Sequence, residues 1–319
     1  MGAFVHFKNM KKTRLALLVP VCISAVAVLL MQGCATSSPS TSAARATADD
    51  ENFPIIDAHT HNHFKGVPER TSKIMDTPEE YLKEMKESNI VGAVVHTGEN
   101  QEDYHPELKQ YNVIYCAGSG AHPNVKNIEN GLKEGKYSCI KIYLGYVHQW
   151  AYDKNYEPLY KLAEKYNVPV VYHTGDTYSV KGKLKYADPL TIDEVAVDHP
   201  NVKFVIAHCG NPWIESAAEV AYKNPNVYLD GSAFMIGDLT KYSPEIINEY
   251  VTKPLAWIFG YVDDPTKLMY GTDWPLTDMK GYLAAFKRAI PKKYWRDVFY
   301  NNATRVFKFP KSPPVPLEN

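Results

Sequence analysis

The sequence has no excess of charge of one sign and no block of five or more like charges. Its 319 residues include 35 lysines and arginines against 36 aspartates and glutamates, a formal net charge of -1. Nucleic acid would therefore meet no general positive field, and we expect no nucleic-acid partner. With 45% hydrophobic and 22% charged residues the composition is that of a globular protein, which excludes wholly disordered and fibrous chains.

Cysteine is also scarce, with five in the chain. Two of them lie in the first 34 residues, which leaves Cys116, Cys139 and Cys209. An odd, widely spaced trio is not typical of a disulfide framework. Because each lies in or at the end of an apolar run, we expect all three to be small buried hydrophobic residues.

The N-terminal segment differs in kind from the rest. A short basic stretch precedes an uncharged, mostly apolar run over 15–31, which ends just before Gly33 and Cys34. This pattern is typical of a secretion signal, although the run is just long enough for an uncleaved membrane anchor. A small residue before the cysteine resembles a bacterial lipobox, after which cleavage and lipidation of Cys34 follow. We therefore expect 1–33 to be a lipoprotein signal peptide and the protein to be exported and lipid-anchored to the cell envelope.

Residues 34–52 are rich in alanine, serine and threonine. Such a segment cannot bury enough apolar surface to order itself, so we expect a flexible tether after the lipidated cysteine. The folded part is then a single domain over 53–319.

Short apolar runs alternate with amphipathic stretches from residue 53 onward. Thr77–Glu80 and Ser243–Glu245 have the residue types that begin helices. This alternation predicts a parallel sheet, and the lack of a glycine-rich phosphate loop after the first run favours a closed (β/α)8 barrel of TIM type over an open sheet. The expected strands are 53–59, 91–96, 113–118, 137–143, 168–173, 202–208, 227–230 and 267–273.

Polar residues of metal-binding type recur where these runs end, which in a barrel is the active-site face. The first run ends in D-A-H-T-H, which places His59 and His61 on one side of the strand. The residues at the later strand ends are Lys141, His173, His208 and Asp273. Their spacing matches whole strand and helix units, so we expect one ring of side chains around the barrel mouth.

Imidazole and carboxylate groups suit zinc and similar divalent ions. Taken singly, His173 or His208 would more often be a core histidine than a ligand, and Asp57 could either support a ligand histidine or play a structural part. Four aromatic residues have two possible interpretations: they form a rim that stacks on a planar substrate, or they simply pack in the core or on the surface. These residues are Tyr146, Trp150, Tyr178 and Trp274.

Seven segments in order resemble the amidohydrolase superfamily, in particular the amidohydrolase-2 branch of predicted metal-dependent hydrolases with a TIM-barrel fold. The likeness covers nearly all of 53–308. The segments are I-I-D-A-H-T-H (55–61), C-I-K-I-Y (139–143), V-P-V-V-Y-H-T-G (168–175), F-V-I-A-H-C-G-N-P-W (204–213), N-V-Y-L-D (226–230), Y-G-T-D-W-P (270–275) and N-A-T-R-V-F (302–307).

The resemblance implies roles for these residues. One divalent ion, zinc rather than another metal and one rather than two, would be held by His59, His61, His173 and Asp273. His208 would orient the water or the substrate, or bind a second metal. Lys141 would either bridge two metals as a carbamate or bind substrate as an ammonium group.

The function this predicts is hydrolysis of a small amide, ester or lactone, with Asp273 as general base and His208 polarising the attacked carbonyl. The alternative is nonoxidative decarboxylation of a small aromatic or related acid, which the same branch includes. That reaction needs a carboxylate partner, and among the arginines after the tether only Arg70 follows a strand end. The third interpretation is a nonenzymatic metal-binding surface lipoprotein. The sequence leaves substrate identity and oligomeric state open.

Overall fold

The computed structural model describes residues 53–100 and 103–309. The expected signal peptide, Cys34 and the tether lie outside these residues. Within them, no helix combines the length and the apolar character needed to cross a membrane.

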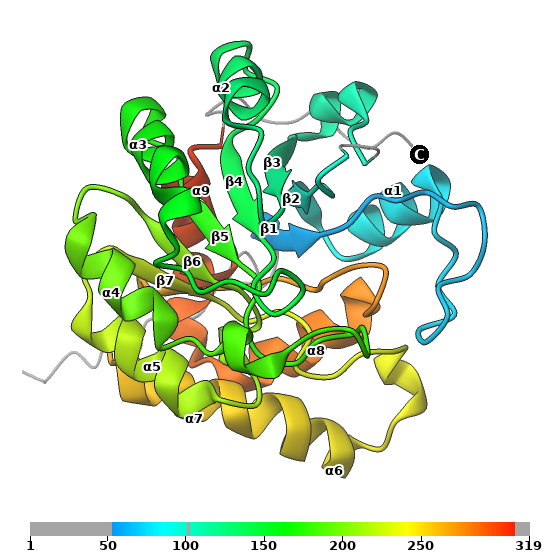
Figure 1. The fold of residues 1–319 in the computed structure, drawn as a ribbon. Helices are drawn as coiled ribbons and strands as arrows, with labels where there is room; N and C mark the ends of the chain where they lie inside the picture. The colour runs from blue at the N-terminus through cyan, green and yellow to red at the C-terminus, as the bar shows by residue number, and fades with distance from the viewer. Residues whose placement is uncertain (1–52, 101–102, 310–319) are drawn as a thin grey trace, which may run out of the picture. The chain divides into compact units, whose positions relative to one another are not determined.

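Eight parallel strands pair in chain order and form a barrel (Figure 1). The barrel closes through backbone hydrogen bonds between the first strand and the segment at the last strand, where Ala58 N donates to Tyr270 O at 2.9 Å and Asp273 N donates to His59 O at 2.8 Å. The predicted single-domain (β/α)8 barrel is confirmed. The strands are β1 (Ile55–Thr60), β2 (Ile90–His96), β3 (Val113–Ser119), β4 (Cys139–Ile142), β5 (Val170–Tyr172), β6 (Phe204–Ile206), β7 (Val227–Asp230) and β8 (Leu268–Met269).

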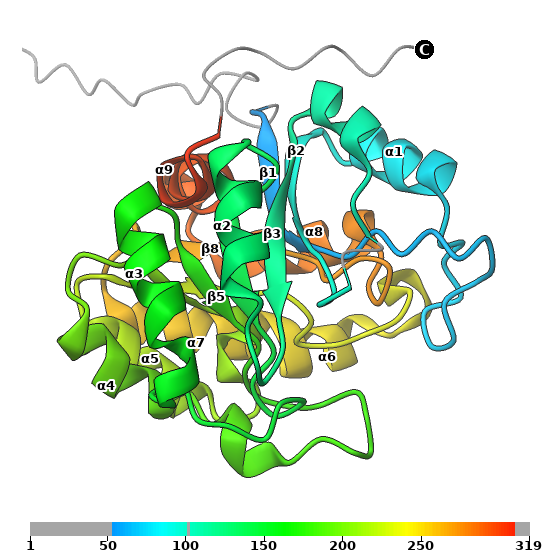
Figure 2. The ribbon, with the colours of Figure 1, turned by 45° about the horizontal axis from the view of Figure 1, so that its top comes forward.

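Helices surround the strands on the outside of the barrel (Figures 1 and 2). Both predicted helix starts are confirmed, because Thr77 accepts a hydrogen bond from Glu80 N and Ser243 accepts one from Ile246 N. The helices are α1 (Pro78–Glu87), α2 (Val125–Lys133), α3 (Glu157–Tyr166), α4 (Thr191–Asp198), α5 (Ile214–Lys223), α6 (Pro244–Ile247), α7 (Lys253–Val262), α8 (Met279–Ala289) and α9 (Asn302–Phe307).

The hydrophobic core has two layers, because successive strand residues point to opposite sides. The larger layer packs the strands against the surrounding helices, and Ile55 belongs to it. The smaller layer contains Ile56, Val94 and Val205 from the strands together with Phe307 from α9. Helix α9 lies beside the starts of the strands in Figure 2 and packs on this smaller layer, at the end of the barrel away from the strand carboxyl ends.

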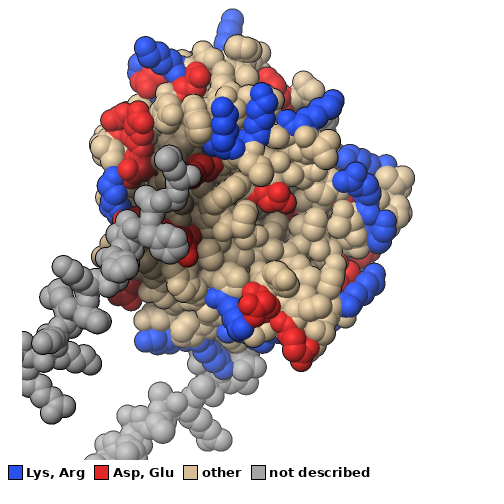
Figure 3. All heavy atoms as spheres, turned by 60° about the horizontal axis from the view of Figure 1, so that its bottom comes forward, with Lys and Arg blue, Asp and Glu red and all other residues tan. Residues whose placement is uncertain are grey.

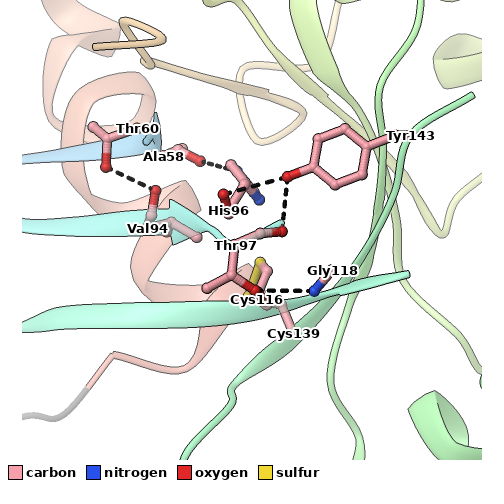
Figure 4. Close-up of a disulfide and its surroundings, with 9 residues drawn as sticks. All are labelled: Ala58, Thr60, Val94, His96, Thr97, Cys116, Gly118, Cys139 and Tyr143. Atoms are coloured by element: carbon pink, nitrogen blue, oxygen red, sulfur yellow. Dashed lines mark hydrogen bonds between the residues drawn. A yellow bond between two sulfur atoms is a disulfide. The ribbon is translucent and has the colours of Figure 1, made fainter. Parts of the chain in front are cut away.

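A disulfide joins Cys116 and Cys139, with a Cα–Cα distance of 4.3 Å (Figure 4). Our expectation that both are free hydrophobic residues was wrong, whereas Cys209 is free and buried as predicted. The two half-cystines lie directly opposite each other on the neighbouring strands β3 and β4. The parallel register brings them together across 23 residues of sequence, which their spacing alone did not reveal.

Candidate metal centre

Three side chains meet at the carboxyl ends of β1 and β8. His61 Nε2 lies 3.2 Å and His59 Nε2 lies 3.5 Å from Asp273 Oδ1. We call this group the His59–His61–Asp273 cluster; each residue offers a ligand atom, and these atoms all lie within 4.8 Å of one another. His59 Nε2 and Asp273 Oδ1 are buried and have no hydrogen-bond partner. Two unpaired buried acceptors facing each other would be costly by themselves, so the residues present fit a divalent cation.

The outer nitrogen of each cluster imidazole is held by a fixed partner. His59 Nδ1 makes a short hydrogen bond with the Asp230 carboxylate, and His61 Nδ1 lies 2.9 Å from the carbonyl oxygen of His96. A carbonyl can only accept, so His61 Nδ1 carries the proton and Nε2 presents its lone pair to Asp273. Sequence reasoning did not assign a role to Asp230, although its position at the end of a predicted strand was the signal that could have found it.

A small network supports this arrangement (Figure 4). The Tyr143 hydroxyl donates to the carbonyl oxygens of Thr97 at 2.8 Å and His96 at 3.3 Å, and the latter is the carbonyl that also binds His61. The His96 ring is fully buried, with Nε2 3.3 Å from the oxygen of Ala58. Tyr143 and His96 therefore support the cluster through the His96 carbonyl that fixes His61, and they lie next to the disulfide.

Asp57 plays a structural part. Its carboxylate accepts hydrogen bonds from the backbone nitrogens of His59 and Thr272, each at 3.0 Å, and from the Thr272 hydroxyl at 2.6 Å. It thereby joins the first strand to the segment after the last one. Of the two roles left open by the sequence, the bonds to backbone favour the structural one.

His173 and His208 form a pair beside the cluster. His208 Nε2 lies 3.1 Å from His173 Nδ1, and the outer nitrogens contact Ser232 Oγ at 3.0 Å and Asp176 O at 2.8 Å. The His208 ring is 4.8 Å from the His59 ring, centroid to centroid. His173 thus lies next to the three clustered residues, and its Nδ1 contacts His208.

Burial governs the charge of these imidazoles. It lowers the pKa of His59 and His173 well below the usual value and that of His208 to about 4. All three are therefore neutral near pH 7, which is the form that binds a metal. Burial would raise the pKa of Asp273, but the neighbouring His61, His208 and Lys141 hold it below its ordinary range, so Asp273 is a carboxylate.

Lys141 is 1% exposed, and its Nζ has no hydrogen-bond partner. Burial lowers its pKa to about 8, against the opposing charges of Asp230 and Asp273. An unpaired buried amine next to the cluster remains compatible with either of the two roles predicted for it.

The backbone is strained at two of these residues. Asp273 and His208 have φ angles of 66° and 60°, in the left-handed region that residues other than glycine rarely occupy. Such conformations cost about 1–3 kcal/mol each and persist where the surrounding structure imposes them, often at active sites.

A cavity of about 810 Å³ opens onto the cluster, the His173–His208 pair and Lys141. Figure 3 shows the face toward which the arrowhead of β4 points. Most of its lysines and arginines lie around the edge, and a few acidic side chains lie within the otherwise uncharged middle. The predicted site residues that line the cavity are His61, Lys141, His173, His208 and Asp273. Of the candidate rim aromatics, Tyr146 and Tyr178 also line it, whereas Trp274 is fully buried, so the rim interpretation was wrong for Trp274.

The amidohydrolase family model matches residues 56–309, which is most of the chain. The chain belongs to the amidohydrolase family. No curated protein matches it.

Solved structures of several other proteins share this fold. A probable 2-pyrone-4,6-dicarboxylic acid hydrolase from Acinetobacter baumannii with citric acid bound is 18% identical, with a TM-score of 0.60 over 81% of this chain and 100% of that one. An amidohydrolase from Burkholderia multivorans with bound zinc is 13% identical, with a TM-score of 0.58 over 81% and 100%. The 5-carboxyvanillate decarboxylase from Sphingomonas paucimobilis is 11% identical, with a TM-score of 0.52 over 72% and 83%.

Proposed function

We propose that this protein is a metal-dependent hydrolase of small amides, esters or lactones. The observation that carries the proposal is the pair of buried, unpaired acceptors His59 Nε2 and Asp273 Oδ1, 3.5 Å apart beside a large open cavity. A divalent cation bound between them would satisfy both acceptors, and the adjoining cavity would give a substrate room beside it.

His59, His61 and Asp273 would hold one divalent ion, with His173 close by as the fourth ligand. We favour zinc, because two imidazoles and a carboxylate suit it and a structurally similar amidohydrolase carries it. Bound there, the ion would supply Lewis acidity and lower the pKa of a water toward about 7.

The chain's own groups divide the remaining work. Asp273, held as a carboxylate, accepts a proton from the attacking water and passes it to the leaving group. His208 is neutral near pH 7. Its Nε2–H, which faces His173 when no substrate is bound, donates a hydrogen bond to the substrate carbonyl oxygen instead. The Lys141 ammonium faces the same cavity and stabilises negative charge that develops there.

The test combines metal content with turnover of 4-nitrophenyl acetate and δ-valerolactone. We expect His59→Ala and Asp273→Ala to lose the metal and at least about 100-fold in kcat/KM while the circular dichroism spectrum stays that of the folded barrel. His199→Ala is the matched control, because its ring pairs with Glu157 and does not line the cavity. An Asp273→Ala protein as active as the wild type would contradict the proposal.

Decarboxylation is the second candidate, and one specific observation favours it. Arg70, the only arginine expected near the mouth, does line the cavity and could hold a carboxylate. A decarboxylase of aromatic acids also shares the fold. Release of carbon dioxide from 5-carboxyvanillate or 2,6-dihydroxybenzoate, with no ester turnover, would favour this function over hydrolysis. A protein that binds metal but performs neither reaction would be the nonenzymatic module.

We also propose that the protein is exported and anchored through a lipid on Cys34. The disulfide between Cys116 and Cys139 supports export, because such bonds form and persist in oxidising compartments and are rare in the cytosol.

A further inference from the structure

Two loops meet at Tyr178 above the barrel mouth. Its hydroxyl donates to Glu69 Oε1 at 2.9 Å and accepts from Arg70 Nε at 3.1 Å, so the loop after β5 is joined to the segment after β1. The Tyr146 hydroxyl accepts from the backbone nitrogen of Tyr178 at 2.8 Å, which holds the residue from the other side. The Arg70 guanidinium carbon lies 4.8 Å from the centroid of the Tyr178 ring.

The acidic side chain next to Arg70 is already engaged. Besides the Tyr178 hydroxyl, the Glu69 carboxylate accepts the backbone nitrogens of Thr71 and Ser72, each at 2.6 Å. Burial opposes its ionisation, but these hydrogen bonds outweigh it and lower the pKa of Glu69. The charge of this carboxylate is therefore stabilised by neutral donors and does not depend on Arg70.

The nearby Asp76 is engaged in the same way. Its two carboxylate oxygens accept from the backbone nitrogens of Phe64 at 3.0 Å and Lys65 at 3.3 Å. Within 53–100 and 103–309, no carboxylate lies within ion-pair distance of Arg70 or of Lys65. Both cations line the cavity, so their charge is available to a ligand there.

Arg70 is held in place at one nitrogen and open at the others. Tyr178 fixes Nε and the plane of the guanidinium, while the two terminal nitrogens have no hydrogen-bond partner among the described residues. An oriented planar fork with unused donors is suited to binding a carboxylate through two parallel hydrogen bonds. Both Arg70 and Asp273 line the same cavity. Arg70 is exposed and lies at its entrance, whereas Asp273 is 5% exposed and lies at its inner end.

We propose that Arg70, oriented by Tyr178, is the specificity-determining residue of the cavity and binds a carboxylate on the substrate, away from the bond that is cleaved. The inference rests on the proposed hydrolase and narrows its substrates to amides, esters or lactones that carry a negative charge. The Lys65 ammonium group adds electrostatic attraction for the same carboxylate but does not fix its orientation. Tyr178 is a positioning residue.

The experiment compares two matched esters, 4-nitrophenyl hydrogen glutarate and its methyl ester, which differ in one charge. We expect the wild type to prefer the acid and Arg70→Met to lose about tenfold or more in kcat/KM for the acid, mainly through KM, because charge-assisted hydrogen bonds are worth about 1.5–3 kcal/mol. The methyl ester should be unaffected. Tyr178→Phe, which keeps the ring and removes the hydroxyl, should lose part of the preference, and Arg70→Lys should restore part of it.

The control is Lys185→Met, which removes an exposed cation that does not line the cavity and should leave both esters unchanged. If Arg70→Met has the same kcat/KM values as the wild type for both esters, the carboxylate subsite is disproved, but the proposed hydrolase activity is not. If the wild type cleaves neither ester, the hydrolase assignment fails for these substrates, and calorimetric titration with glutarate decides the subsite. Binding that Arg70→Met abolishes supports it, and no binding by the wild type overturns it.

Discussion

Each imidazole of the His59–His61–Asp273 cluster is oriented by a bond on its outer nitrogen, and the two partners differ. His61 bonds a backbone carbonyl, which only accepts, whereas His59 bonds the side chain of Asp230, which is fully buried. The second Asp230 oxygen accepts from Ser232 N at 2.9 Å, so the carboxylate cannot rotate freely. A ligand histidine whose tautomer and orientation are fixed in advance binds a metal more tightly.

Asp230→Asn is therefore expected to weaken metal binding about 10-fold to 100-fold, because an amide no longer imposes the required tautomer on His59. Titration of the metal-free protein with zinc against a chelating dye measures this change. Asp103→Asn is the control, since Asp103 is also buried and bonds an imidazole, that of His63, which lies outside the cluster. Equal zinc affinities of Asp230→Asn and wild type would contradict the role.

Glu84 makes stability depend on pH. Its carboxylate accepts from Trp274 Nε1 at 3.2 Å and Met279 N at 2.8 Å, and burial raises its pKa from 4.5 to about 7. The folded protein then holds the proton more tightly than the unfolded chain does. The free energy of unfolding should fall as pH rises from about 4.5 to about 7, by up to about 3 kcal/mol.

Urea unfolding at a series of pH values checks this expectation against Glu84→Gln, which has no proton to lose. The variant should show a smaller decrease over the same interval. Parallel pH profiles for the two proteins would mean that the Glu84 pKa is close to that of the unfolded chain.

At the scale of the elements, an irregularity in β1 places the two candidate ligands His59 and His61. Asp57 lies opposite Ala93 on β2 and Thr60 lies opposite Val95, so three steps on β1 correspond to two on β2. A bulge of this kind redirects side chains and is common beside active sites. Regular alternation predicts His59 and His61 on one side of the strand, and the bulge adjusts where each ring ends.

The disulfide is an element-scale constraint, because it joins β3 to β4 two residues before Lys141. Replacing both half-cystines by alanine should lower the free energy of unfolding by about 3 kcal/mol for a loop of this length. Urea unfolding measures the loss, and mass spectrometry of the proteolysed wild type should detect the linked peptides. Cys209→Ala, which removes a buried thiol that is not part of a disulfide, is the packing control. A double variant no less stable than this control would contradict the prediction.

For the whole molecule, the proposed lipid anchor on Cys34 predicts where the protein resides in a bacterial cell. Cys34→Ala should abolish incorporation of labelled palmitate and block cleavage of the signal. Cys22→Ala, a change inside the signal itself, should leave both unchanged. Labelling and fractionation of cells that express each protein test this directly. Normal lipid labelling of Cys34→Ala would contradict the anchor, and uncleaved, unlabelled wild type would favour the membrane-anchor alternative.

Much of the architecture and part of the candidate site were predictable. Strand order and closure follow from eight apolar runs separated by amphipathic stretches, since a parallel strand needs a covering helix before the next one. His59, His61 and Asp273 were predictable as neighbours because each lies at or shortly after the carboxyl end of a predicted strand. The position of Asp230 at a strand end was a usable signal, but its bond to His59 and the Tyr178 contact were not predictable, because neither a hydrogen bond across the barrel nor the path of two loops has a local sequence signal.

The sequence by itself determined the barrel, the face on which polar groups gather and the family, since strand periodicity and strand-end chemistry are local properties. Only the tertiary structure decided which polar groups touch. Parallel register paired Cys116 with Cys139, a hydrogen bond fixed His59 on Asp230, and His173 contacts His208 at 3.1 Å beside the other three predicted ligands. Contacts between distant segments depend on register, side-chain direction and loop path, which residue spacing does not specify.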